Sequence, residues 1–231
     1  MKRILLKLSG EALAGAEKKG FDEATVIAVA KQIRAVAEEG TQIGIVIGGG
    51  NFWRGRTSET INRNKADQIG MLATVMNCIY VSDICRYLGL KTEIFTPFVC
   101  GAFTKLYSKD AVEEAFAEGK ILFFAGGTGH PYFSTDTATV LRAVEIEAEA
   151  ILLAKAVDGI YDSDPKVNPE AVKYDEISIQ EVIDQKLAAV DLTASILCLE
   201  NKMPMLVFGL NEENSIVETM SGNFTGTKVT V

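Results

Sequence analysis

Short apolar runs that end in glycine-rich turns alternate with amphipathic stretches along almost the whole of this 231-residue chain. Runs of this length are typical of buried strands, and apolar residues recurring every three or four positions are typical of helices. Stretch 42–50, QIGIVIGGG, illustrates the first pattern, and the stripe that begins at Val26 illustrates the second. We expect strands at 4–10, 42–50, 92–98, 120–127, 150–161, 205–210 and 227–231, and helices at 22–40, 66–88, 109–118, 137–150, 179–187, after Asp191, and near 212–220. We expect Asp22 to be the N-cap of the helix at 22–40, and Ser178 and Glu181 to form a capping box for the helix at 179–187.

Strands that alternate with helices in this way form βαβ units, in which helices cover both faces of a mainly parallel sheet. We therefore predict an α/β fold built on one such sheet. The sequence has no repeat, low-complexity segment or clear linker, although loop 165–169 separates two halves. Helix 66–88 is apolar on more than one face, which favours burial or a subunit interface.

The bulk composition narrows the class of protein. A formal net charge of −8 argues against broad nucleic-acid binding by charge alone. We judge no stretch long and apolar enough to cross a bilayer, and the apolar part of the N-terminus too short for a signal peptide, so we expect a cytoplasmic protein. Four cysteines without CxxC spacing and a single histidine disfavour a structural zinc site and predict buried free thiols.

Four glycine-rich or aspartate-rich turns fall at the carboxyl ends of predicted strands, where ligands bind in open parallel sheets. They are Lys7–Gly10, Gly48–Gly50, Gly126–Gly129 and Val157–Gly159. Glycine lets the main chain approach a ligand closely, and successive N–H groups in such turns bind anions. One turn alone could serve the backbone only, but several at one edge of a sheet favour an anion site.

Stretch 125–136, AGGTGHPYFSTD, is the richest of these turns. Thr128, Ser134 and Thr135 offer hydroxyl groups, and a helix starting near Thr135 would point its positive end at the same space. We predict a cradle for a phosphate or carboxylate, with Thr135 or Asp136 as the helix N-cap. The alternative is a tight turn and a cap with no ligand.

Lys7 interrupts an otherwise apolar predicted strand, where burying an unpaired ammonium group would be costly. Placement at the edge of the sheet, or snorkelling, would explain it without a function. We favour a lysine that faces an anion from the end of the strand, beside Ser9 and Gly10, where it would offset charge on a transferring phosphoryl group. For His130 we favour a structural or weak contact role over general-acid catalysis.

Two familiar nucleotide-binding motifs do not fit. Stretch 15–21 has the glycine spacing of a Walker A loop, but Phe21 stands where the lysine is required. Stretch 127–132 begins like a dinucleotide fingerprint, but Tyr132 replaces the third glycine. Any nucleotide site in this chain must therefore be of another kind.

Six segments occur in an order that matches a known family: KLSGEAL, VIGGGNFWRG, ADQIGMLATVMN, AGGTGHPYFSTD, VDGIYDSDP and AVDLTA. Together they resemble the bacterial uridylate (UMP) kinases of the amino acid kinase superfamily, from about Lys2 to the C-terminus. GGGNxxRG combined with GTGxPxFxTD is specific to this group, whereas KLSG alone indicates only the superfamily.

The resemblance implies a three-layer αβα sandwich unrelated to P-loop kinases. It implies one amino acid kinase domain over residues 1–231, with a UMP-binding part at roughly 1–150 and an ATP-binding part at roughly 151–231. The implied reaction transfers the γ-phosphoryl group of ATP to UMP, giving UDP in pyrimidine nucleotide biosynthesis. Mg²⁺ would arrive with ATP and take no protein ligand. The family pattern is a homohexamer, activated by GTP and inhibited by UTP, with no nucleic-acid or membrane partner.

The resemblance also implies roles for single residues. Lys7 would bridge the transferred group, Asp191 would be an acidic active-site residue that orients the lysine or the metal, and Asp67 would bind the nucleoside of UMP. The implied ATP-binding residues are Lys7, Leu8, Ser9, Gly10, Gly50, Arg54, Lys155, Tyr161 and Asp164. The implied UMP-binding residues are Gly49, Asp67, Thr128, Gly129, His130, Pro131, Tyr132, Phe133, Ser134 and Thr135.

The implied chemistry suits the composition. The second pKa of a phosphate monoester is about 6, so the attacking oxygen of UMP needs no protein base at neutral pH.

The segment around Lys155 and the segment 14–21 depart from the family pattern, which leaves the adenine contacts and GTP regulation open. Two rival functions remain: a kinase of the same fold that acts on a small carboxylate or carbamate, and a non-catalytic nucleotide sensor. The presence of Lys7 counts against the sensor.

Overall fold

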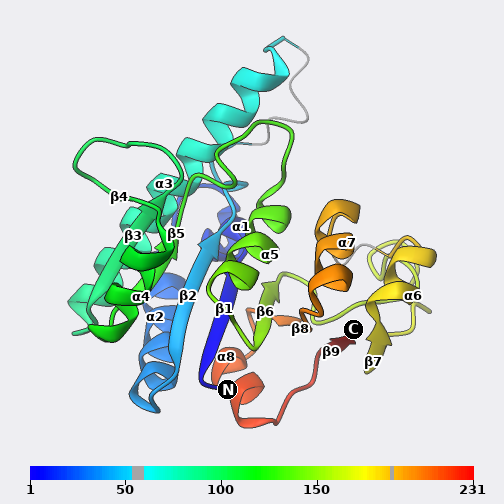
Figure 1. The fold of residues 1–231 in the computed structure, drawn as a ribbon. Helices are drawn as coiled ribbons and strands as arrows, with labels where there is room; N and C mark the ends of the chain where they lie inside the picture. Colours follow the sequence, from blue (N-terminus) through cyan, green and yellow to red (C-terminus); the bar gives the residue numbers. More distant parts are fainter. Residues whose placement is uncertain (54–59, 188–189) are drawn as a thin grey trace.

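The computed structural model describes residues 1–53, 60–187 and 190–231 (Figure 1). Nine strands form one sheet in the order β4-β3-β5-β2-β1-β6-β8-β9-β7. All neighbouring strands in this sheet pair in parallel except β8 and β9, which pair antiparallel. The predicted α/β fold is therefore confirmed. The strands are β1 Arg3–Leu8, β2 Gln42–Ile47, β3 Thr92–Thr96, β4 Lys105–Leu106, β5 Ile121–Phe124, β6 Ala150–Lys155, β7 Glu176–Ser178, β8 Met205–Gly209 and β9 Thr227–Thr230.

Helices connect the strands and cover both faces of the sheet. They are α1 Gly10–Leu13, α2 Glu23–Glu38, α3 Arg63–Tyr87, α4 Lys109–Ala117, α5 Thr135–Glu145, α6 Ile179–Asp184, α7 Leu192–Asn201 and α8 Ser215–Ser221, with a short 3₁₀ helix at Gly15–Glu17. Residues of α2, α3 and α8 share one core cluster, and residues of α4, α5, α6 and α7 share another. The sheet between them makes the fold a three-layer αβα sandwich.

Strand β1 lies in the middle of the sheet and is buried on both sides. Its even-numbered residues, such as Ile4 and Leu6, belong to the core cluster of α2 and α3. Leu5 points the other way, into the cluster that includes α5 and α7. Because side chains alternate along a strand, Lys7 lies on the same face as Leu5. Placement of Lys7 at a sheet edge is therefore wrong.

The helix caps agree with the sequence at two of the three positions for which we made a prediction. Asp22 caps α2 by accepting a hydrogen bond from the Thr25 N–H at 2.7 Å. Ser178 and Glu181 form the predicted capping box of α6. The expected cap of α5 was wrong: Ser134, with an extended backbone, caps this helix, and the residues after it form the first turn.

Helix α3 corrects a second expectation. It has 25 residues and is long and apolar enough, by length and composition alone, to cross a membrane. The core helix of a soluble protein passes the same test, and α3 packs on the sheet through buried residues that include Cys78 and Val81. A stripe of partly exposed apolar side chains remains on its outer face: Ile69, Leu72, Met76 and Ile79.

The cysteines follow the prediction with one exception. Cys78, Cys85 and Cys198 are buried free thiols, whereas Cys100 is only partly buried. Burial raises the pKa of the Cys85 and Cys198 thiols to about 12. These two thiols are therefore fully protonated at neutral pH and poorly nucleophilic.

Candidate active site

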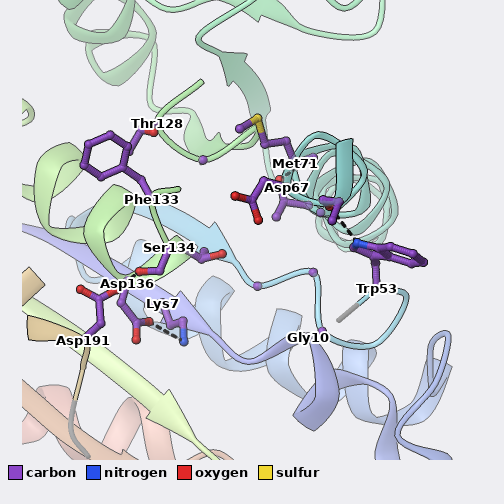
Figure 2. Close-up of a pocket in the computed structure, with 18 of the residues that line it drawn as sticks. Lys7, Gly10, Trp53, Asp67, Met71, Thr128, Phe133, Ser134, Asp136 and Asp191 are labelled. Carbon is purple, nitrogen blue, oxygen red and sulfur yellow. Dashed lines mark hydrogen bonds and ion pairs between the residues drawn. The ribbon is translucent and has the colours of Figure 1, made fainter. Parts of the chain in front are cut away.

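A cavity of about 500 Å³ opens at the carboxyl ends of β1, β2 and β5, which are neighbours in the sheet. Helix α3 contributes one wall, and the N-terminus of α5 contributes another. Figure 2 shows Asp67 and Met71 from α3 on one side of this space and Lys7, Asp136 and Asp191 on the other. Lys7 and residues of the 125–136 stretch therefore line the same cavity.

Most of the expected site residues line this cavity. Those that do are Lys7, Ser9, Gly10, Gly49, Gly50, Asp67, Thr128, His130, Phe133, Ser134, Thr135 and Asp191. The expected residues that are described but do not line it are Leu8, Gly129, Pro131, Tyr132, Lys155, Tyr161 and Asp164. Leu8 is fully buried in the core, so only its main chain could meet a nucleotide. Arg54 lies outside the described residues.

Lys7 reaches the cavity from β1 and forms an ion pair with Asp136 of α5. Its Nζ lies 3.1 Å from Asp136 Oδ1, and the Lys7 side chain is only 13% exposed. This carboxylate compensates the charge that would otherwise make a lysine in a central strand costly. The sequence indicates Asp136 only as a candidate helix cap, and its ion pair with Lys7 is seen only in the structure.

Asp191 lies at the same end of the cavity and caps α7. Its Oδ1 accepts a hydrogen bond from the Ala194 N–H at 2.9 Å, and its Oδ2 accepts one from the Ser134 hydroxyl. Because Ser134 in turn caps α5, the N-termini of α5 and α7 meet at this point. The positive ends of two helices therefore converge beside Lys7, which favours an anion there.

The two glycine turns at the ends of β1 and β2 pack against each other with no room for side chains. A Cβ atom at Gly10 would lie 2.2 Å from the Gly48 carbonyl oxygen. A Cβ atom at Gly49 would lie 3.0 Å from the carbonyl oxygen of Gly70 on α3. Glycine is needed at these positions because the main chains approach each other closely, and this leaves main-chain groups accessible to a ligand.

Asp67 extends from the first turns of α3 and is only 15% exposed at its side chain. Its Oδ2 accepts hydrogen bonds from Arg63 Nε at 2.8 Å and from the Tyr132 N–H at 2.7 Å. The Arg63 guanidinium group also lies over the Tyr132 ring, 5.3 Å from its centroid. Asp67 thus holds the 125–136 stretch against α3 and lines the cavity with the same carboxylate.

A second cavity, of about 410 Å³, opens at the ends of β6 and β8 and is lined by Tyr161. The Tyr161 hydroxyl donates to Asp158 Oδ1 at 2.7 Å, and Lys173 Nζ lies 2.7 Å from Asp158 Oδ2. Burial raises the pKa of Asp158, but the hydrogen bonds from Lys173 and Tyr161 outweigh this effect and leave it below its ordinary value. Asp164 instead accepts a hydrogen bond from the Lys166 N–H in the following loop.

Lys155 is the last residue of β6. In the sheet, β6 lies between β1, whose end contributes to the first cavity, and β8, whose end contributes to the second. Burial lowers the pKa of Lys155, the Asp136 carboxylate opposes this shift, and the positive charge of Lys7 adds to it. Lys155 is therefore electrostatically coupled to the Lys7–Asp136 pair.

Residues 2–209 match the model of the amino acid kinase family. The chain belongs to the amino acid kinase family. It is also similar to the crystal structure of UMP kinase from Ureaplasma parvum, at 34% identity and a TM-score of 0.94, over 100% of this chain and 99% of that one. For UMP kinase from Bacillus anthracis the identity is 33% and the TM-score 0.94, over 99% and 96%. Uridylate kinase from Archaeoglobus fulgidus, at 24% identity and a TM-score of 0.76 over 99% and 100%, shares the fold.

Sequence analysis of this amino acid kinase missed a buried pair of asparagines beneath the glycine turns. Asn51 and Asn77 exchange side-chain hydrogen bonds of 3.0 and 2.8 Å. Asn77 Nδ2 also donates to the Gly48 carbonyl at 2.7 Å, and Asn51 Nδ2 to that of Gly20 at 2.8 Å. The pair fixes the turn after β2. Two asparagines 26 positions apart give no local pattern that would reveal such a contact.

Proposed function

We infer that this amino acid kinase is a UMP kinase, which transfers the γ-phosphoryl group of ATP to UMP and supplies UDP in pyrimidine nucleotide biosynthesis. The observation that carries this conclusion is the single cavity in which Lys7 faces the glycine turns of β1, β2 and β5. Two UMP kinases that match nearly the full chain at 34% and 33% identity support the choice of substrate.

The attacking phosphate oxygen of UMP is ionised at neutral pH, so the site needs no general base. Its task is to bring two polyanions together and hold their oxygens in line. Lys7 neutralises charge on the transferred group, while the main-chain N–H groups of Gly10 and Gly50 hold the phosphates of ATP. The N-terminus of α5 and the Thr128 hydroxyl hold the phosphate of UMP, since both face the same cavity.

The nucleosides occupy opposite ends of the site in this proposal. Asp67 accepts hydrogen bonds from the ribose hydroxyls of UMP, because it is the carboxylate of α3 that lines the first cavity. The adenosine part of ATP lies toward the second cavity, beside Tyr161. Lys155 lies near the ATP phosphates between these ends.

Mg²⁺ enters with ATP, and when bound it neutralises negative charge on the phosphate oxygens. Mg²⁺ takes oxygen ligands and is commonly held by one or two carboxylates together with substrate phosphates. Asp136 and Asp191 both line the cavity beside Lys7, so the residues present fit such an ion. Asp136 and Asp191 are the side chains that would hold the ion, whereas the family resemblance implies an ion that arrives with ATP and takes no protein ligand.

The assembly and regulation of the enzyme are further parts of the proposal. A homohexamer in the cytoplasm, activated by GTP and inhibited by UTP, follows the family pattern. The partly exposed apolar stripe on α3 supports self-association through this helix.

A substrate panel tests the proposed function. ADP release from ATP is followed with UMP, CMP, acetylglutamate, aspartate or carbamate as acceptor, each with and without GTP. We expect turnover with UMP at least about a hundredfold above the carboxylates and carbamate, a ratio that corresponds to about 2.7 kcal/mol of transition-state binding. Faster turnover of a carboxylate or carbamate would refute the assignment, and tight UTP binding without turnover of any acceptor would favour a nucleotide sensor.

A further inference from the structure

We propose that Thr74 of α3 is a positioning residue that holds the phosphate-binding stretch 125–136 in place through the main-chain N–H of Gly126. This inference rests on the proposed function for its kinetic consequence, but not for its geometry. Thr74 is 4% exposed and lines the cavity close to where that stretch leaves β5.

The hydroxyl group of Thr74 has a fixed orientation. Its Oγ1 donates to the Met71 carbonyl at 2.7 Å and accepts from the Gly126 N–H at 2.8 Å. A hydroxyl group can donate only one hydrogen bond, and this one is donated to the Met71 carbonyl. The oxygen therefore acts as the acceptor for the Gly126 N–H. The contact is directional and lies in the buried interior.

Gly126 needs this acceptor because it lies just beyond the hydrogen-bond ladder of the sheet. Strand β5 ends at Phe124, and the Ala125 N–H still bonds to the Phe95 carbonyl of β3 at 2.9 Å. The chain then turns at Gly126, where φ is +79°, and a Cβ atom there would lie 2.8 Å from the Phe98 ring. Thr74 therefore supplies the Gly126 N–H with an acceptor, in the role that the carbonyl groups of β3 have for the residues before it.

A second anchor lies on the same face of α3. Asp67, seven residues before Thr74, accepts from the Tyr132 N–H at 2.7 Å. Seven residues are close to two turns of an α-helix, so both side chains point at the same stretch. Tyr132 has φ of +74°, a left-handed conformation that is unfavourable for a tyrosine and that its surroundings must hold. Helix α3 thus holds the main chain at residues 126 and 132, and Thr128 lies in the segment between these two contacts.

The functional consequence concerns UMP more than ATP. The stretch between the two anchors carries Thr128 and leads into the N-terminus of α5, and these two groups would hold the UMP phosphate. Among the described residues, Thr74 hydrogen-bonds to Met71 and Gly126 and not to Lys7 or the β1 turn. Loss of the Thr74 hydroxyl should therefore weaken UMP binding and leave ATP binding nearly intact. A merely structural role would lower stability without separating the two substrates.

The test compares two substitutions at this position. Thr74→Val removes the hydroxyl and keeps the shape, while Thr74→Ser keeps the hydroxyl and removes a methyl group. We expect Thr74→Val to raise the KM for UMP about tenfold, the size expected for an orphaned buried donor, and the KM for ATP less than about twofold. Thr74→Ser should restore the KM for UMP. Ser82 is also on α3, and Ser82→Ala removes a buried hydroxyl contact with Thr92 of β3; this variant should change neither KM.

Amide hydrogen exchange gives a readout that does not depend on activity. The Gly126 amide should exchange at least about tenfold faster in Thr74→Val than in wild type, and Thr74→Ser should regain protection. Equal exchange rates and equal KM values for UMP in the valine and serine variants would overturn the proposal. If Thr74→Val does not fold, Thr74→Ala makes the same comparison with serine. A wild type that does not phosphorylate UMP would defeat the proposed function, and the exchange experiment would still decide the role of Thr74.

Discussion

Replacing Lys7 by alanine removes the ammonium group that faces the cavity from the centre of the sheet. Lys7 Nζ lies 3.1 Å from Asp136 Oδ1, so it already holds one anionic oxygen at ion-pair distance. For a phosphate oxygen about 4 Å away, in surroundings with an effective dielectric constant of about 20, the attraction is about 4 kcal/mol. If this attraction develops mainly in the transition state, its loss lowers kcat by about a thousandfold.

The assay measures kcat by coupled ADP release at saturating ATP and UMP, and UMP binding by calorimetry. Lys7→Ala should lower kcat by orders of magnitude and change the Kd for UMP only a few-fold, because the proposed UMP contacts come from α3 and the 125–136 stretch. Lys2→Ala is the matched control, because Lys2 is an exposed lysine just before the same strand. A kcat within a few-fold of wild type would show that Lys7 does not stabilise the transferred group.

Four further predictions concern separate features. In Asp67→Asn the side chain can still accept a hydrogen bond from the Tyr132 N–H but carries no charge, so the KM for UMP should rise about tenfold. An unchanged KM in steady-state assays would show that Asp67 is not part of the UMP site. Asn77→Leu deletes three hydrogen bonds, two of them buried, and should lower the free energy of unfolding by about 3 kcal/mol in urea titrations. A loss under about 1 kcal/mol would show that the asparagine pair is not stabilising. Burial raises the pKa of Cys198 to about 12, so a thiol reagent at pH 8 should modify this residue only after unfolding. Rapid labelling of Cys198 in the native protein, detected by mass spectrometry, would contradict this prediction. Replacing both Leu72 and Met76 by Gln should reduce the molar mass measured by light scattering, and an unchanged multimer would place the interface elsewhere.

Local sequence signals predicted the elements of the fold well because each element carries its own information. The apolar run of β2 and the stripe of α2 are determined by burial, and the Asp22 cap by a contact three residues away. Strands that we expected at 4–10 and 150–161 end earlier, at Leu8 and Lys155, because the following glycine and aspartate turns leave the ladder. The short strands β4 and β7 were missed, since two or three residues give no period to detect.

The candidate site was predictable where a turn follows a strand and unpredictable where two distant segments meet. The glycine turns could be assigned to one edge of the sheet from topology alone. The partner of Lys7 could not, because Asp136 is brought to it by tertiary packing and has an alternative local explanation as a helix cap. The same holds for Asn77, whose partners lie more than two dozen positions away in the chain.

The two anchors that α3 provides for the 125–136 stretch constrain the length of the helix between them. Each residue in an α-helix advances the face by about 100°, so one residue inserted between Asp67 and Thr74 would turn the two side chains apart. Both main-chain contacts could not then form together, whatever residue was added. We therefore expect related enzymes that use this arrangement to keep the spacing of seven unchanged.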